Sequence, residues 1–391
     1  MNLKETSFPI GFALTLLELE SDVHPILHKL RQAEPVSWVP VIDCWLVTDR
    51  DLCIKIMRDA KTYTVDHPGF TTAQVVGSSM LSLDGVEHGK HRAPFDKPFR
   101  KREVENRYEG LVSNFANELI DGFIAGGRAE LRREFCGPIA VKTMIAALGM
   151  ENISVEEVLT LNDRIVDAVT RLTAGEPISP EGSAAFETLK SKLIPALAHE
   201  PESNMLAAAV GNIGSLSVDE AISNAAILLF GGIETTEGMI ANAMYHLLTN
   251  PDVLARVKED VTLIPAVIEE SLRLEPAASA VDRYTTLDVQ IGNVTIKEGD
   301  LVRVSLAASN RDPAVFPNPD QFDPTRKNLR SHVTWAHGPH VCLGLHLARL
   351  EAQKSVELLI QRLPNIAAKN VNEAVPAGLI FRKPEALNVS W

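Results

Sequence analysis

Apolar residues recur at helical spacing through the middle of the chain. Between positions 111 and 123 they lie three and four residues apart, and two glycines follow at 126 and 127. This spacing is typical of an amphipathic helix that ends at glycine. We therefore predict that helix dominates the central part of the protein.

Strand patterns occupy other parts of the sequence. Residues 36–47 are rich in β-branched and aromatic side chains, and residues 289–296 alternate on either side of Gly292 and Asn293, as in a hairpin. Residues 379–389 predict a further strand pair. Because no internal repeat and no linker rich in Pro, Gly or Ser divides the sequence, we expect one mainly α-helical domain over residues 1–391, with small β-sheets.

The most informative segment is residues 217–250. It opens with a capping box, in which Glu220 follows Ser217 by three residues, and it stops before Pro251. At ~1.5 Å per residue this helix would be on the order of 50 Å long. Its centre, residues 225–230, is apolar on every side, so we expect a buried helix rather than a surface helix.

Small and polar residues follow this apolar centre directly, namely Gly231, Gly232, Glu234 and Thr235. Two glycines inside a helix cost roughly 2 kcal/mol relative to alanine. A buried carboxyl group also costs free energy unless it has a partner. We therefore expect these residues to have a functional role that outweighs their cost in stability.

Composition narrows the classes of function. The formal net charge is -13, which argues against a nucleic-acid-binding protein, since such proteins carry a net basic face. Hydrophobic residues make up 45% of the chain, enough for a large core. The first apolar stretch, residues 10–17, is too short to span a membrane. We therefore expect a soluble cytoplasmic protein.

The four cysteines have no repeating spacing, which argues against a disulfide framework. Cys342 stands out because Gly338 and Gly344 frame it and residues 343–350 predict the start of a helix. A helix N-terminus stabilises a thiolate. One alternative is a buried structural thiol. The other is a zinc site, for which the candidate ligands would be His337, His340, Cys342 and His346. These four residues crowd one turn, whereas zinc is usually bound by two pairs of ligands that are separated in the sequence.

A charged pair precedes this cysteine in the chain. Glu270 and Arg273 lie three residues apart in a helical pattern over residues 264–274, so they share one face of the helix. Alone, such a pair is typical of a surface salt bridge. Its place in the sequence is more informative, because it follows the buried helix and precedes Arg283 and the cysteine.

In this order the motifs resemble those of the cytochrome P-450 family of haem-thiolate monooxygenases. The signature of the family is a Phe followed by Gly-x-Arg/His-x-Cys-x-Gly. Residues 335–344 match it, with Trp335 in place of phenylalanine. The resemblance covers nearly the whole chain. It implies a single large helical domain of the soluble bacterial type, with haem b buried between the long central helix and the Cys-bearing loop.

The resemblance also implies roles for individual residues. Cys342 would be the axial thiolate ligand of the iron. The haem propionates would bind cationic donors, namely His88, Arg92, Arg283 and His340. Gly231 and Gly232 would make room for oxygen, Thr235 would hydrogen-bond it, and Glu234 would belong to the proton path. Glu270 and Arg273 would stabilise the fold, and their loss would prevent haem incorporation.

Substrate contacts can be located by the same resemblance but not identified. The candidates are Phe70, Val75, Val76, Phe230, Ala277, Ala280 and Leu379. Small residues at 277–280 indicate an open pocket near the haem, and a mid-sized apolar organic molecule is expected to fill it.

Electron supply is expected to come from a separate protein, since no flavin or iron–sulfur motif accompanies the haem motifs. A ferredoxin or flavodoxin with its reductase, drawing on NAD(P)H, would dock where residues 96–102 turn an acidic chain locally basic. A solvated helix end would explain these charges equally well.

Two other functions stay open: a peroxide-driven peroxygenase and a haem-based gas sensor or binder. The Glu234-Thr235 pair argues against both.

Overall fold

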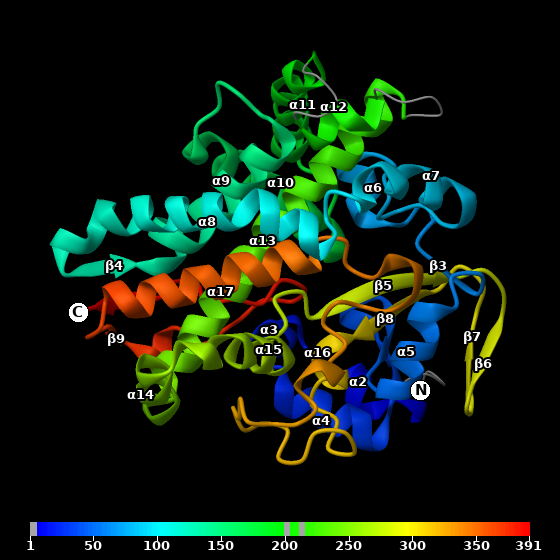
Figure 1. Cartoon of the computed structure of the whole chain (residues 1–391). Coiled ribbons are helices and arrows are strands. Elements are labelled where there is room, and N and C mark those ends of the chain that lie inside the picture. The colour runs from blue at the N-terminus through cyan, green and yellow to red at the C-terminus, as the bar shows by residue number, and fades with distance from the viewer. Residues whose placement is uncertain (1–5, 199–203, 211–215) are drawn as a thin grey trace. The chain divides into compact units, whose positions relative to one another are not determined.

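The computed structural model describes residues 6–198, 204–210 and 216–391, and its elements are labelled in Figure 1. The chain divides into two compact units, each assembled from three segments. The first unit comprises Met1–His67, Ala266–Cys342 and Pro376–Lys383, and the second comprises Pro68–Pro265, Leu343–Val375 and Pro384–Trp391.

A mixed sheet in the order β1-β2-β8-β5-β3 forms the framework of the first unit. β2 runs parallel to β8, and the other neighbours are antiparallel. Trp45, Val47, Val302 and Val304 point into a buried apolar cluster, as β-branched and aromatic residues do on a covered sheet face. The strands are β1 (Val36–Val39), β2 (Cys44–Val47), β3 (Tyr63–Thr64), β5 (Ala280–Thr285) and β8 (Leu301–Ser305).

Short helices pack around this sheet. The predicted hairpin over residues 289–296 is confirmed as β6 (Val289–Ile291) and β7 (Val294–Ile296), and Gly292 takes a φ of +56° in its turn, a conformation that favours glycine. The helices are α2 (Pro9–Ala13), α3 (Leu16–Glu20), α4 (His24–Ala33), α5 (Arg50–Arg58) and α16 (Leu306–Ser309). Most of α15 (Ile264–Leu274) also belongs to this unit.

The second unit is built on one long helix, α13 (Val218–Thr249). Its capping box is formed in both directions between Ser217 and Glu220, and α14 (Pro251–Glu259) begins directly after Asn250. The prediction of a long buried helix over residues 217–250 is therefore confirmed to within a residue at each end.

Other helices enclose α13. α9 (Gly137–Leu148) and α17 (Leu345–Arg362) pack against it, and α8 (Lys101–Phe123) lies beside α17 (Figure 1). The remaining elements are α6 (Thr71–Val76), α7 (Gly85–Asp96), α10 (Val155–Thr173), α11 (Pro180–Leu193), α12 (Met205–Val210), β4 (Arg128–Glu130), β9 (Ala367–Ala368) and β10 (Asn388–Ser390).

The prediction of a strand pair over residues 379–389 is wrong. β10 pairs with β4 and β9 in the second unit. The segment Pro376–Lys383 belongs to the first unit and forms only bridges there, between Ala377 and Lys383 and between Ala278 and Phe381. Pro384 separates the two parts, and proline lacks the N–H that a continuing ladder needs.

Candidate active site

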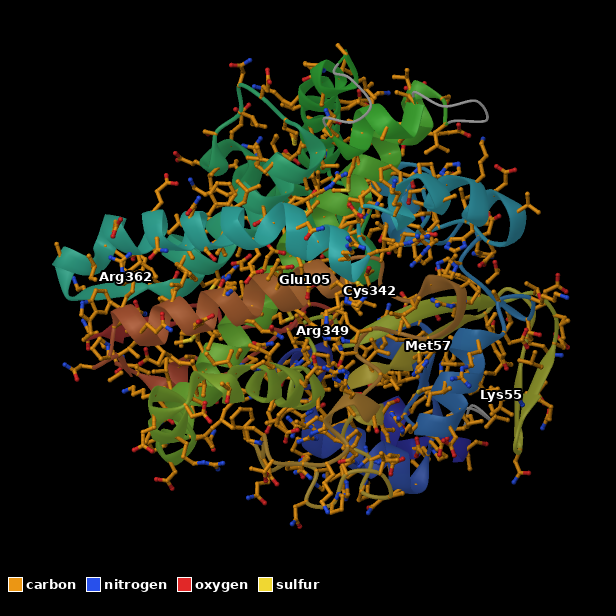
Figure 2. The ribbon with its side chains drawn as sticks, in the orientation of Figure 1. Lys55, Met57, Glu105, Cys342, Arg349 and Arg362 are labelled. Carbon is orange, nitrogen blue, oxygen red and sulfur yellow. The ribbon has the colours of Figure 1, made fainter. Side chains whose placement is uncertain are left out.

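The loop that carries Cys342 is tightly turned. Its Cys342 N–H donates to the carbonyl oxygen of Trp335 at 2.9 Å, and a 3-10 turn spans Gly338–His340. Gly338 has a φ of +76°, and a Cβ there would collide with the carbonyl oxygen of Met57 on α5. Figure 2 labels Cys342 and Met57. Only glycine therefore allows the loop to lie against α5.

Cys342 is the cysteine best suited to bind iron. It is partly exposed, whereas Cys44, Cys53 and Cys136 are buried. Burial raises the pKa of both Cys44 and Cys53 to about 12, so both remain neutral thiols. A metal ligand must be a thiolate that the metal can reach. The donor chemistry of the Cys342 loop thus fits a haem iron.

A narrow face of α13 is open although the helix is buried. Between Asn224 and Met244 every residue is buried except Leu228, Gly231, Gly232 and Thr235. These four positions follow the i, i+3, i+4, i+7 spacing of one helix face. These four partly exposed positions, here called the open stripe, set one face of the helix apart from its otherwise packed surface.

The two glycines of this stripe have different neighbours. A Cβ at Gly231 would meet no atom within 4 Å, whereas a Cβ at Gly232 would lie 2.6 Å from Met144 Sδ on α9. Gly231 therefore borders open space, and Gly232 allows α9 to pack closely. The sequence pattern predicted the same role for both residues and could not separate them.

Thr235 faces the open stripe, and Glu234 does not. The Thr235 hydroxyl donates to the carbonyl oxygen of Gly231 at 2.6 Å, which leaves its lone pairs able to accept a hydrogen bond. Glu234 is 3% exposed and lies about 100° around the helix axis from Thr235. The acid and the hydroxyl are adjacent in sequence but occupy different faces.

The four predicted propionate donors lie on three elements. His88 is buried and shares one face of α7 with Arg92, which pairs with Asp96 Oδ1 at 3.2 Å. Arg283 is buried on β5, and its Nη1 donates to the Asp282 carbonyl oxygen at 2.7 Å. His340 ends the 3-10 turn of the Cys342 loop. Each of these side chains can donate to a carboxylate when it is charged.

Glu270 and Arg273 form a fully buried ion pair. Both side chains are 0% exposed, with Arg273 Nε 2.8 Å from Glu270 Oε2 and Nη2 2.8 Å from Glu270 Oε1. Arg326 Nε donates to the same carboxylate at 2.9 Å. Arg273 also donates to the carbonyl oxygens of Asn310, Pro319 and Gln321. The pair ties α15 to the loops that precede the cysteine.

The predicted substrate residues fall into one group in each unit. In the second unit, Phe70 directly precedes α6, Val75 and Val76 lie in it, and Phe230 lies on α13; all four are buried, and α6 packs against α10 and α13. In the first unit, Ala277 is buried, while Ala280 and Leu379 are partly exposed.

The structure brings two of these substrate segments together in the first unit. Ser279 N–H donates to the Ile380 carbonyl oxygen at 2.8 Å, and its hydroxyl donates to the Leu379 carbonyl oxygen at 3.0 Å. About a hundred residues separate these partners in the sequence, so the sequence pattern gave no sign of their pairing.

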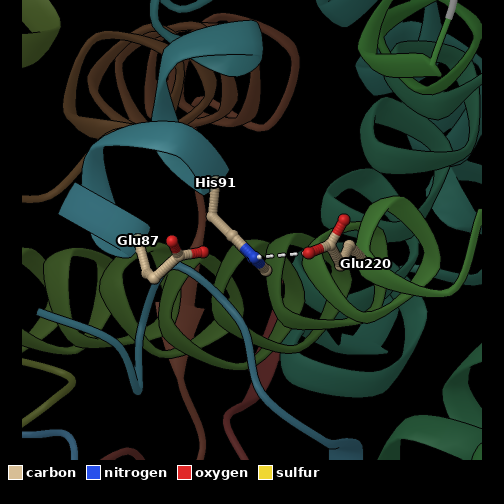
Figure 3. A group of neighbouring side chains, drawn as sticks. All are labelled: Glu87, His91 and Glu220. Atoms are coloured by element: carbon tan, nitrogen blue, oxygen red, sulfur yellow. Dashed lines mark ion pairs between the residues drawn. The ribbon is translucent and has the colours of Figure 1, made fainter. Parts of the chain in front are cut away.

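A cluster of possible metal ligands lies elsewhere. Within the described ranges, Glu87, His91 and Glu220 place ligand atoms within 4.8 Å of one another (Figure 3). Lys90 Nζ already lies 2.6 Å from Glu220 Oε1, so the carboxylate is neutralised without a metal. This ion pair, together with the capping hydrogen bond from Ser217, lowers the pKa of Glu220 to about 2.

The tautomer of His91 also argues against a metal. Asn224 Oδ1 accepts from the Met80 N–H at 2.8 Å, so Asn224 Nδ2 is the donor to His91 Nδ1 at 2.9 Å. His91 then carries its proton on Nε2, which faces Glu220 at 3.5 Å. A protonated nitrogen offers no lone pair to a metal. The cluster instead ties α7 to the start of α13.

None of the helices within residues 6–198, 204–210 and 216–391 has the combined length and hydropathy that a membrane span requires.

Comparison with known proteins gives consistent matches. A family model described as Cytochrome P450 matches residues 190–373. The chain is 35% identical over 368 residues to Cytochrome P450 107B1 of Saccharopolyspora erythraea, covering 88% of each chain. It is 30% identical over 407 residues to Nocardicin C N-oxygenase of Nocardia uniformis subsp. tsuyamanensis, covering 98% of each. The solved structure of P450BioI in complex with hexadec-9Z-enoic acid ligated Acyl Carrier Protein is similar with a TM-score of 0.86 at 26% identity, covering 97% of this chain and 100% of that chain.

Proposed function

Because the chain belongs to the cytochrome P450 family of haem monooxygenases, we propose that it inserts one oxygen atom from O2 into a small-to-medium apolar organic substrate. Its electrons come from NAD(P)H through a separate ferredoxin or flavodoxin. The observation that carries the proposal is the open stripe of α13, where Gly231 borders free space and Thr235, whose hydroxyl donates to the Gly231 carbonyl oxygen, can still accept a hydrogen bond.

The residues of this chain take distinct roles in the proposal. Cys342 holds the iron of haem b, and the propionates are held by His88, Arg92, Arg283 and His340. When bound, the haem would supply the redox centre at which O2 is activated with electrons from the donor protein. Thr235 holds a proton at Oγ1 beside the open stripe, and Glu234 belongs to the path that replenishes it.

An apolar substrate is supported by the residues around the proposed site. Leu228 lies on the open stripe of α13, and no charged residue lies on that stripe. Apolar walls with few polar groups are typical of sites for small organic molecules. The related P450BioI structure holds hexadec-9Z-enoic acid on a carrier protein, so the fold accommodates an apolar chain.

The proposal is tested by titrating the ferric protein with a panel of apolar organic compounds and recording the change in iron spin state. Compounds that bind are then incubated with NAD(P)H, O2, a ferredoxin and its reductase. We expect an oxygenated product with these components. Product that forms only with hydrogen peroxide, or no product from any bound compound, would contradict the proposal.

Replacing Thr235 with alanine is expected to uncouple electron use from product formation. A positioned proton donor contributes about 100-fold or more in rate, so we expect product formed per NAD(P)H consumed to fall by at least ~10-fold. Thr235→Ser keeps the hydroxyl and is the matched control, expected to retain most of the coupling. Wild-type coupling in the alanine variant would remove Thr235 from the proton path.

The start of α8 is proposed as the docking surface for the electron donor. Arg100, Lys101 and Arg102 are exposed there, and no side chain caps the helix. Cations are unfavourable at a helix N-terminus because of the helix dipole. Lys101 pairs with Glu105 one turn along the helix at 3.6 Å, but the helix dipole does not favour Arg100 and Arg102, whereas attraction of an acidic ferredoxin or flavodoxin does.

Reversing two of these charges, in the double variant Arg100→Glu and Arg102→Glu, is expected to slow reduction by an acidic ferredoxin by about 10-fold or more at low salt. The difference should shrink as salt screens the charges, and reduction by dithionite should not change. The control is Lys29→Glu with Lys369→Glu, two exposed lysines whose reversal changes the net charge equally. Equal rates in both double variants would exclude this surface.

A further inference from the structure

The segment Pro376–Lys383 has no regular secondary structure, yet one buried side chain holds it in place. Arg382 is 1% exposed. Its guanidinium donates to the carbonyl oxygens of Gly378 at 2.8 Å and Pro376 at 2.9 Å within this segment. The segment therefore folds around the arginine, and we call it the Arg382 turn.

The same guanidinium ties the Arg382 turn to two other parts of the first unit. Nη2 donates to the Ser21 carbonyl oxygen at 2.9 Å, and Nε donates to Glu275 Oε1 at 2.8 Å. Four donor contacts thus come from one rigid fork, a geometry that lysine cannot reproduce. The N-terminal segment adds a bond from Gly378 N–H to the Glu20 carbonyl oxygen at 2.7 Å.

Glu275 is the centre of the charges around this turn. It is 5% exposed, and His24 Nε2 lies 2.7 Å from its Oε2. Burial alone would raise the pKa of Glu275, but His24 and Arg382 outweigh burial and hold the pKa well below its ordinary value. The carboxylate is therefore ionised, and it anchors both the Arg382 guanidinium and the His24 ring in a low-dielectric environment.

The Arg382 turn positions residues of the proposed substrate site. Leu379 lies inside it, and the Arg382 N–H donates to the Ala277 carbonyl oxygen at 2.8 Å. Together with the Ser279 bonds, this fixes Leu379 beside residues 277–280. Gly378 has a φ of +122°, and a Cβ there would collide with the Phe381 carbonyl oxygen, so the turn has one tightly specified shape.

We propose that Arg382 and Glu275 are positioning residues that fix Leu379, and thereby set how closely the enzyme fits a bulky apolar ligand. The inference rests on the proposed function, in which Leu379 contacts substrate. Arg382 itself need not touch the ligand. Loss of its fork would remove four of the hydrogen bonds that hold the turn, and a wall residue that is held less firmly contributes less contact.

The test compares two nitrogen ligands of the haem in the intact holoenzyme. Imidazole is small and reports on the iron alone, whereas clotrimazole carries bulky aromatic groups that also need the pocket walls. We expect Arg382→Lys to lower the affinity for clotrimazole about 10-fold, which corresponds to the binding free energy of one apolar side-chain contact. The affinity for imidazole should change less than about 2-fold. The matched control is Arg303→Lys, an equally buried arginine that pairs with Asp282 and makes no bond to the turn.

His24→Gln provides a second, milder variant, because it replaces the imidazole that contacts Glu275 at 2.7 Å and leaves Arg382 in place. If Arg382→Lys does not fold, the His24→Gln variant tests the inference instead. We expect its affinity for clotrimazole to fall about 3-fold. Unchanged clotrimazole binding, or equal losses for both ligands, would overturn the inference. Wild-type protein that binds neither ligand would instead contradict the proposed function, so the two failures can be told apart.

Discussion

Cys342→Ser is expected to abolish the absorption band that carbon monoxide produces with thiolate-bound ferrous haem, together with all NAD(P)H-driven oxidation. A thiolate donates electron density to the iron. A serine hydroxyl stays protonated near neutral pH and cannot replace it. The CO difference spectrum of dithionite-reduced protein measures the band, and product formation should fall to the level of a mixture without enzyme.

Cys53→Ser is the matched control for this experiment. The Cys53 thiol is buried and donates to the Val47 carbonyl oxygen at 3.3 Å, and a serine hydroxyl can make the same bond. We expect this variant to keep the full band. A normal CO band in Cys342→Ser, or its loss in Cys53→Ser with normal haem content, would contradict the assignment of Cys342 as the ligand.

Arg273→Met is expected to have the largest effect on stability. Removing one partner of a buried ion pair leaves the other charge unpaired and costs about 3–5 kcal/mol, whereas a folded protein is stable by only about 5–15 kcal/mol. Glu270 would keep one cation, Arg326, but the bonds to three loop carbonyls would be lost. We expect little folded, haem-containing protein, measured as CO-reactive haem per total protein.

Lys297→Met serves as the control for charge removal. Lys297 pairs with Asp288 at 2.6 Å, but the two side chains are 68% and 54% exposed, and exposed pairs contribute about 0–1 kcal/mol. Haem content and melting temperature should therefore match those of wild type within error. Arg273→Met protein that loads haem and melts like wild type would show that the buried pair does not hold the fold.

The sequence was most informative where partners lie close together in the chain. The capping box of α13 joins residues three apart, and the Gly292-Asn293 turn joins adjacent strands. Both were predicted correctly. The family resemblance rested on several motifs in a fixed order, and the relatives of similar length confirm it.

Prediction failed where the partners are distant in the sequence. Glu275 and Arg382 are 107 residues apart, and neither belongs to a recognisable motif. The strand at residues 388–390 pairs with β4 rather than with the residues just before it, because a short apolar pattern does not specify its partner. The difference between Gly231 and Gly232 depends on Met144 of another helix, which no local pattern reveals.

The parallel pairing of β2 with β8 has a consequence for how the chain is made. Trp45 lies opposite Val302 in this ladder, so the first strands leave the ribosome long before their partner exists. At ~5–20 residues per second the delay is on the order of 10–50 s. During that time the apolar hairpin of β1 and β2 has an unpaired edge, which is prone to aggregation. The Arg382 turn is synthesised later still, so the first unit can be completed only after residue 383 has been made.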